Sequence, residues 1–158
     1  MSIPNKPANN TFRKGGNNPK PVITLSNNYR ACVNSGYYME GGNGLSSIKK
    51  ELVVDYAVEI ANKFAQAKVT STQIRSFYDA VKQVETRVDI TSLDYDQLME
   101  DIYPLLAVVR LKCEKETLPV VFEEFLKLNI SNINNKKDIK AFEKHFKTIL
   151  CYMPQKKK

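Results

Sequence analysis

Basic and aromatic side chains that could bind phosphate groups lie close together in one helical segment. At roughly 100° per residue, Arg75, Tyr78 and Lys82 fall on one flank of that helix. Lys68 lies in the preceding turn, near a helix start whose free amides and dipole favour an anion. This combination suits contact with a nucleic-acid backbone. The alternative is a solvated flank in which Arg75 pairs with Asp79 at i, i+4, and spacing alone favours that alternative.

Two further groups of basic residues are candidates for the same chemistry. Arg110 falls at the edge of the buried stripe of its helix, and Lys112 and Lys115 follow it. The alternative here is an arginine whose stem covers the core boundary while its charge reaches water. The last helical segment carries an excess of lysines, which could face phosphate or only keep the surface solvated. These lysines are Lys136, Lys137, Lys140, Lys144 and Lys147.

Nothing in the sequence indicates catalysis. The chain lacks the glycine-rich, GxSxG and HExxH motifs of the common enzyme classes. His145 is the single histidine, and we expect it at the surface or at the core boundary. The three cysteines are far apart in the sequence, which predicts reduced thiols and neither a disulfide framework nor a CxxC metal site. We therefore expect no catalytic residue, no metal and no cofactor.

In one stretch, residues 89–109, all of the charged residues are acidic. Asp89, Asp94, Asp96, Glu100 and Asp101 lie in this segment without any basic residue. The segment lacks the DxDxDG loop that wraps calcium, and acids are favoured at helix N-termini by the helix dipole. We interpret it as capping and solvation, with a docking surface for a basic neighbour as a further option.

The net charge points to a polyanionic partner but does not locate the contact. The 158 residues carry a formal charge of +7, which favours nucleic acid first and an acidic protein or a lipid surface second. All of this excess lies in residues 1–44 and 156–158, so the segment between them is formally neutral. Any phosphate site in the folded part must therefore be a local cluster. The sequence has neither an apolar run long enough for a bilayer nor a signal peptide, and we expect a cytoplasmic protein.

The positions of the apolar residues predict an all-α fold, a compact bundle of about five helices. The expected helices cover about residues 47–66, 70–88, 94–113, 117–128 and 135–153. Capping boxes at Thr70 and Asp94 mark two starts, and Pro104 predicts a kink or a break in the third helix. We expect a flexible, basic leader over residues 1–35, the helical domain over 36–153 and a basic tail over 154–158.

Five short motifs, in this order and spacing, resemble one known family. They lie in residues 36–45, 56–61, 69–78, 103–110 and 142–152. The most specific is the segment VTSTQIRSFY, which is similar to a recurring Thr…Gln-(Ile/Leu)-Arg-x-Phe-Tyr pattern. The sequence thus resembles the small helical subunit of the type III-A CRISPR interference complex, the Csm complex.

The resemblance implies a non-catalytic RNA-binding subunit of a prokaryotic antiviral ribonucleoprotein. Several copies would stack head to tail along the guide CRISPR RNA (crRNA) and its target RNA. They would lie opposite the repeat-fold backbone subunits and contact the Cas10-type large subunit. The expected phosphate contacts are Lys68, Arg75, Lys82 and Arg110, with Lys112 and Lys115 as second choices.

Three alternatives remain open from the sequence. The first is a helical protein-interaction adaptor with basic tails and no RNA contact. The second is a cysteine-dependent enzyme that uses His145, which the spacing does not favour. The third is the equivalent subunit of the related type III-B complex.

Overall fold

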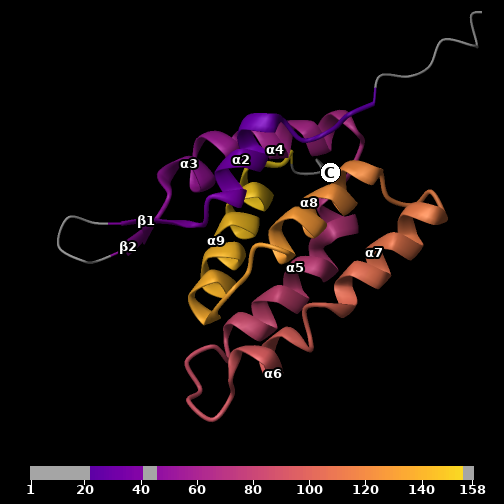
Figure 1. Ribbon diagram of the computed structural model, residues 1–158. Coiled ribbons are helices and arrows are strands. Elements are labelled where there is room, and N and C mark those ends of the chain that lie inside the picture. Colours follow the sequence, from indigo (N-terminus) through magenta and orange to yellow (C-terminus); the bar gives the residue numbers. More distant parts are fainter. Residues whose placement is uncertain (1–21, 41–45, 155–158) are drawn as a thin grey trace, which may run out of the picture.

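The computed structural model describes residues 22–40 and 46–154, and these residues form a mostly helical bundle with one small hairpin (Figure 1). This confirms the all-α fold class. The elements in chain order are α2 (Asn27–Asn34), β1 (Tyr38–Glu40), β2 (Ser46–Ile48), α3 (Lys50–Val53), α4 (Asp55–Gln66), α5 (Ser71–Glu85), α6 (Tyr95–Met99), α7 (Pro104–Glu114), α8 (Val120–Ile130) and α9 (Lys136–Tyr152). No helix in the described ranges is both long and apolar enough to cross a bilayer.

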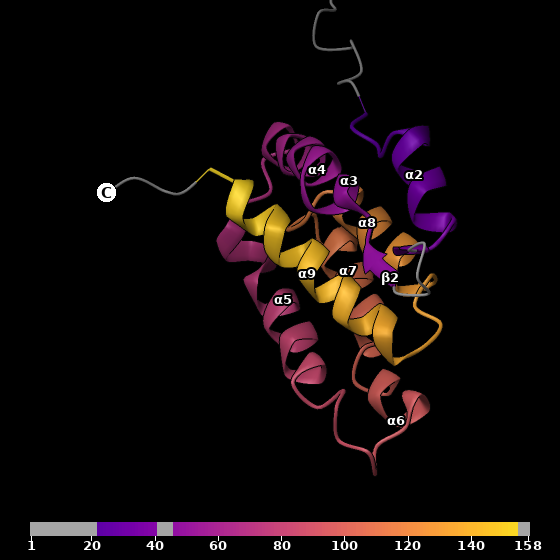
Figure 2. The ribbon, with the colours of Figure 1, turned by 90° about the vertical axis from the view of Figure 1, so that its left-hand side faces the viewer.

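The last helix, α9, is the centre of the packing. It packs against α3, α4 and α5, and Figure 2 shows it running along the face formed by its neighbours. Its buried phenylalanines meet aromatic rings from two other helices, α5 and α8. Phe125 of α8 is the hub of this cluster, with ring centroids 5.4 Å from both Phe64 and Phe146 and 5.9 Å from Phe142. The phenylalanines of α4, α8 and α9 therefore form the centre of the core.

The predicted helix starts hold in the structure. The side chains of Thr70 and Asp94 each accept a hydrogen bond from the backbone N–H of the third helical residue, a glutamine. In return, the backbone N–H of Thr70 or Asp94 donates to the side-chain oxygen of that glutamine, so both capping boxes are complete. Pro104 breaks the third expected helix into α6 and α7 and lies in the first turn of α7, where its missing N–H costs nothing. Helix α8 begins directly after Pro119, which is its N-cap residue.

The first expected helix is also broken, at Val54. This residue has φ −124° and ψ −81°, which is outside the helical region, and it separates α3 from α4. The sequence gives no proline or glycine there to mark the break. Packing sets the break, because Leu52 and Ala57 are both fully buried. On one continuous helix these two positions would point in different directions, and only one of them would face the core.

The expected leader is shorter than 35 residues. Residues 1–21 lie outside the described part of the chain, but Leu25, Tyr29 and Val33 are buried, and α2 packs against α8. The low apolar content of this segment led to the expectation of flexibility. Two buried residues one turn apart, capped by Ser26, are enough to anchor the helix. The rest of the expected tail after Pro154 also lies outside the described residues.

A buried polar network connects α2 to the bundle, and it corrects the expected surface position of His145. His145 is fully buried. Its Nδ1 contacts the carbonyl oxygen of Leu52 at 2.5 Å and its Nε2 lies 2.7 Å from the Tyr29 hydroxyl. Because a carbonyl only accepts, Nδ1 donates and Nε2 accepts from Tyr29. Asn129 in turn donates to Tyr29 and accepts from Tyr37.

Candidate nucleic-acid interface

The basic flank of α5 lies against α9, and together they form a charged surface strip. We call this strip the basic seam and define it as Arg75, Tyr78 and Lys82 of α5 with Glu143 and Lys147 of α9. The Tyr78 ring packs edge-on against Phe146 at 5.5 Å, which fixes the ring between the two helices. The three residues predicted on one flank of α5 therefore do face the same neighbour.

Glu143 is the shared counter-ion of the seam. It is only 4% exposed, and its Oε2 accepts a hydrogen bond of 2.5 Å from the Tyr78 hydroxyl. Burial, followed by this hydrogen bond, raises the pKa of Tyr78, so the phenol stays protonated. The ammonium groups of Lys82 and Lys147 lie 3.9 and 4.0 Å from the same oxygen, too far for strong pairing, and Lys82 makes its closer ion pair with Glu85 at 3.1 Å. Both lysines stay about half exposed.

Arg75 has the most available positive charge in the seam. Its side chain is exposed, and among the described residues it forms no ion pair, so the predicted alternative of a bond to Asp79 is not observed. It lines a shallow depression of about 330 Å³ together with Tyr78, Lys147, Leu150 and Cys151. A guanidinium at the edge of an open depression can bind an external oxyanion without first breaking an internal pair.

Lysines of α9, which are not among the six predicted phosphate contacts, extend this surface. Lys140, Lys144 and Lys147 follow one another at i, i+4 and i+7, so they lie on one face of the helix. Lys140 pairs with Asp89 at 2.9 Å, whereas Lys144 is exposed beside the β1–β2 hairpin. Their helical spacing was the signal that could have identified them.

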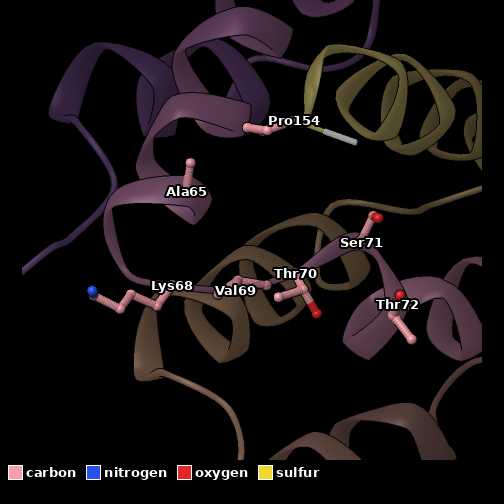
Figure 3. Close-up of a pocket in the computed structure, with 7 residues that line it drawn as sticks. All are labelled: Ala65, Lys68, Val69, Thr70, Ser71, Thr72 and Pro154. Carbon is pink, nitrogen blue, oxygen red and sulfur yellow. The ribbon is translucent and has the colours of Figure 1, made fainter. Parts of the chain in front are cut away.

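Lys68 occupies the turn before α5, as expected, but it does not complete a cradle at the helix start. It has a left-handed backbone with φ 67°. It lines a depression with Val69, Thr70 and Thr72, and Figure 3 shows its amino group extending away from Thr72. The Thr70 hydroxyl already accepts a hydrogen bond from the backbone N–H of Gln73. Lys68 is therefore an exposed charge near the seam helix and not part of a preformed phosphate pocket.

The α7 candidates lie on a different surface. Figure 1 shows α7 and α9 on opposite sides of the bundle, and in the turned view of Figure 2 α7 lies behind α9. Arg110 pairs with the buried carboxylate of Glu123 at 3.3 Å and with Glu114 at 3.4 Å, which matches the core-boundary alternative. Lys112 is half-buried and Lys115 is exposed. The six predicted residues therefore form two groups and not one continuous site.

The structure also removes the support for catalysis by His145. Both ring nitrogens are occupied, and burial lowers the pKa of the imidazole to about 4. Cys151, the nearest thiol in sequence, is exposed on the surface while His145 is fully buried. Among the described residues no group of three potential metal ligands occurs, and Asp94 is used as a helix cap.

The fold and surface define a small helical protein with a local basic strip. The chain matches the family model described as Csm2 Type III-A over residues 47–157. No curated protein and no solved structure matched it. Because the match spans well over half of the sequence, the chain belongs to the Csm2 family. It is a small structural subunit of the type III-A Csm complex, and it assembles there with other Csm subunits.

Proposed function

We propose that this subunit binds the phosphate backbone of the paired crRNA and target RNA through the basic seam and does so without catalysis. The observation that carries the proposal is Arg75, an exposed guanidinium that forms no ion pair with the described residues and lies beside Tyr78 and Lys147 in an open depression. Several copies stack along the RNA and contact the Cas10-type and repeat-fold backbone subunits. The role is antiviral RNA recognition in the cytoplasm of a prokaryote.

An electrostatic strip that does not read bases is sufficient for this role. Pairing between guide and target supplies the specificity, so the protein needs only to hold the duplex. Each phosphate contact with a nucleic-acid backbone lowers log K by roughly 0.7 to 0.9 per unit of log salt, so three contacts make a weak and salt-sensitive site. Several copies on one RNA gain affinity through their effective concentration.

The two groups of candidate residues have different parts in the proposal. Lys68, Arg75 and Lys82 are the principal contacts, extended along α9 by Lys147. The second group is Arg110, Lys112 and Lys115 on α7. Arg110 would have to exchange two carboxylate partners for a phosphate, which makes it the weaker candidate.

The decisive experiment replaces Arg75 by glutamate in the assembled complex. We expect Arg75→Glu complexes to release target RNA at lower salt than wild type, because the substitution changes the local charge by two units. Lys127→Glu is the matched control, since Lys127 is an exposed lysine on α8 that belongs to neither group. Arg110→Glu is measured in parallel and should have the smaller effect. RNA retention is followed during a salt titration on immobilised complexes.

The same titration tests the alternative of an adaptor without RNA contact. If Arg75→Glu and wild-type complexes release RNA at the same salt concentration, the seam does not bind RNA. An unchanged result for both Arg75→Glu and Arg110→Glu would favour the adaptor. A loss with Arg110→Glu alone would move the contact to α7.

A further inference from the structure

Helix α2 precedes the part of the chain that matches the family model, which begins at residue 47. It nevertheless fills a slot in the bundle. Leu25, Tyr29 and Val33 follow one another at intervals of four residues, and all three are buried. Helix α2 packs against α8, and Figure 2 shows it at the outer edge of the bundle. It is therefore an additional element that covers a surface of the family domain.

The floor of this slot combines aromatic and polar groups of three helices. The Tyr29 ring lies 5.6 Å from the ring of Tyr56 on α4 and 5.7 Å from that of His145 on α9. The Tyr29 hydroxyl donates to Nε2 of His145 and accepts from the side-chain amide of Asn129 on α8. Both of these partners are fully buried, and both would lose a hydrogen bond without Tyr29. The floor is thus built to receive a phenol group.

The rim of the slot is charged and partly open to solvent. Glu124 of α8 accepts a hydrogen bond of 3.0 Å from the Thr24 hydroxyl and pairs with Arg30 at 3.5 Å. On α4, Lys63 donates to the carbonyl oxygen of Thr24, and Glu59 accepts from the N-cap residue of α2, both at 2.7 Å. Exposed contacts of this kind add little to stability, because water can replace them.

Several features of α2 suit an element that can leave its slot. It has eight residues, mostly polar, and a helix this short is not stable without its neighbours. Surfaces that separate are more polar than a permanent core, and here polar groups lie on both the floor and the rim. Gly36, directly after the C-cap of α2, has φ 101°, and a Cβ at this position would meet no atom within 4 Å. The chain therefore has room to turn there.

We propose that the slot between α4, α8 and α9 is a docking groove for a short helix of another protein, and that α2 closes it as a displaceable latch. The contacts of α2 define the partner. It has a central tyrosine for His145 and Asn129, an apolar residue four positions to either side, and a basic residue next to the tyrosine for Glu124. This is recognition of an amphipathic helix in a groove. The contacts involve no residue of the basic seam.

A latch makes a distinctive prediction about affinity. An external helix binds only the open fraction of the protein, so its apparent dissociation constant is the intrinsic value divided by that fraction. A substitution that weakens α2 in the chain therefore raises the apparent affinity for an external helix. The same substitution in the external helix lowers it. This opposite sign distinguishes displacement of α2 from binding at an unrelated surface.

The probe is a fluorescein-labelled synthetic peptide of residues 22–36, added to the full chain under reducing conditions and followed by fluorescence anisotropy. Tyr29→Phe in the peptide should weaken binding roughly tenfold, because two buried groups lose their partner. Tyr29→Phe in the chain should strengthen binding of the wild-type peptide. Arg30→Glu should act with the same pair of signs, because it places a second acid beside Glu124. Circular dichroism verifies that the chain variants are folded.

Asn28→Ser is the matched control, because Asn28 is an exposed residue of the same helix. This substitution should leave the affinity unchanged whether it is in the peptide or in the chain. Hydrogen exchange followed by mass spectrometry gives a second measurement on the unmodified full chain. The amides of α2 should exchange at least about tenfold faster than those in the middle of α9. Tyr29→Phe should accelerate exchange in α2 and leave α5 unchanged.

Four outcomes would overturn the inference. One is the absence of peptide binding to both latch-weakened chains, and another is equal binding of the wild-type and Tyr29→Phe peptides. A substitution that weakens binding from either side would place the peptide on a different surface. Exchange of α2 as slow as that of α9 would make α2 a permanent part of the core. All of these results are independent of the salt titration of Arg75→Glu, which tests the RNA contact.

Discussion

The buried histidine makes the stability of this protein depend on pH in a predictable window. In the folded state His145 is neutral, since its Nδ1 donates to the Leu52 carbonyl and its Nε2 accepts from Tyr29. Protonation would turn Nε2 into a donor that faces the Tyr29 hydroxyl, and it would place a charge in the core. Burial therefore lowers the pKa of His145 from 6.5 to about 4.

The size and sign of the effect follow from this pKa difference. Between pH 4 and pH 6.5 the unfolded chain binds a proton at His145 and the folded chain does not, so the free energy of unfolding decreases as the pH falls. The largest slope is about 1.4 kcal/mol per pH unit, and the total loss across the window is about 3 kcal/mol. Above pH 6.5 the residue is neutral in both states and contributes no pH dependence.

Urea unfolding followed by circular dichroism, at several pH values from 5 to 7.5, measures this slope. Because the chain has one histidine, His145→Gln removes all imidazole titration, and the slope between pH 5 and 6.5 should become nearly flat. Tyr29→Phe is the control. It weakens the network but keeps the buried imidazole, so it should lower stability and keep the slope. Equal slopes for wild type and His145→Gln would refute the reasoning.

Two further predictions concern the core and the seam. Phe125→Ala removes the hub of the aromatic cluster and should lower the free energy of unfolding by about 3–5 kcal/mol, as measured by chemical denaturation; a loss below about 1 kcal/mol would mean that the cluster is not the core. Tyr78→Phe removes the hydroxyl that hydrogen-bonds the nearly buried Glu143 and should cost about 1–3 kcal/mol in the same assay. That cost should largely disappear when Glu143 is also replaced by leucine, and a persistent cost would show that the hydrogen bond is not its cause.

Local signals were sufficient to predict most of the helices. The capping boxes at Thr70 and Asp94 and the break before Pro104 act through nearest neighbours in the sequence, so they could be predicted without knowledge of packing. Helix α2 was missed because only Tyr29 and Val33 of its polar sequence are buried. Its stability comes from contacts with residues about a hundred positions away, such as the 116-residue separation between Tyr29 and His145.

The candidate site was predictable on one helix but not between helices. Helical spacing placed Arg75, Tyr78 and Lys82 on a common flank, and the structure shows that this flank meets α9. The pairing of Arg110 with Glu123 could not be predicted, because Glu123 belongs to a neighbouring helix and its position depends on the tertiary fold. The same limit applies to Lys147, which joins the seam only when α9 packs against α5.

A neutral folded domain can bind a polyanion when its internal ion pairs are weak at one place. The seam has this property, because Lys147 meets the Glu143 carboxylate only at 4.0 Å, while Lys82 pairs with the partly exposed Glu85 at 3.1 Å and lies 3.9 Å from Glu143; both lysines remain about half exposed. Exposed pairs of this kind contribute no more than about 1 kcal/mol, so turning either ammonium towards a phosphate costs little. Glu143 keeps its bond to Tyr78 throughout and is never left unpaired in the core. The fold thus holds a cluster of positive charges whose partners can be exchanged at a small cost in stability.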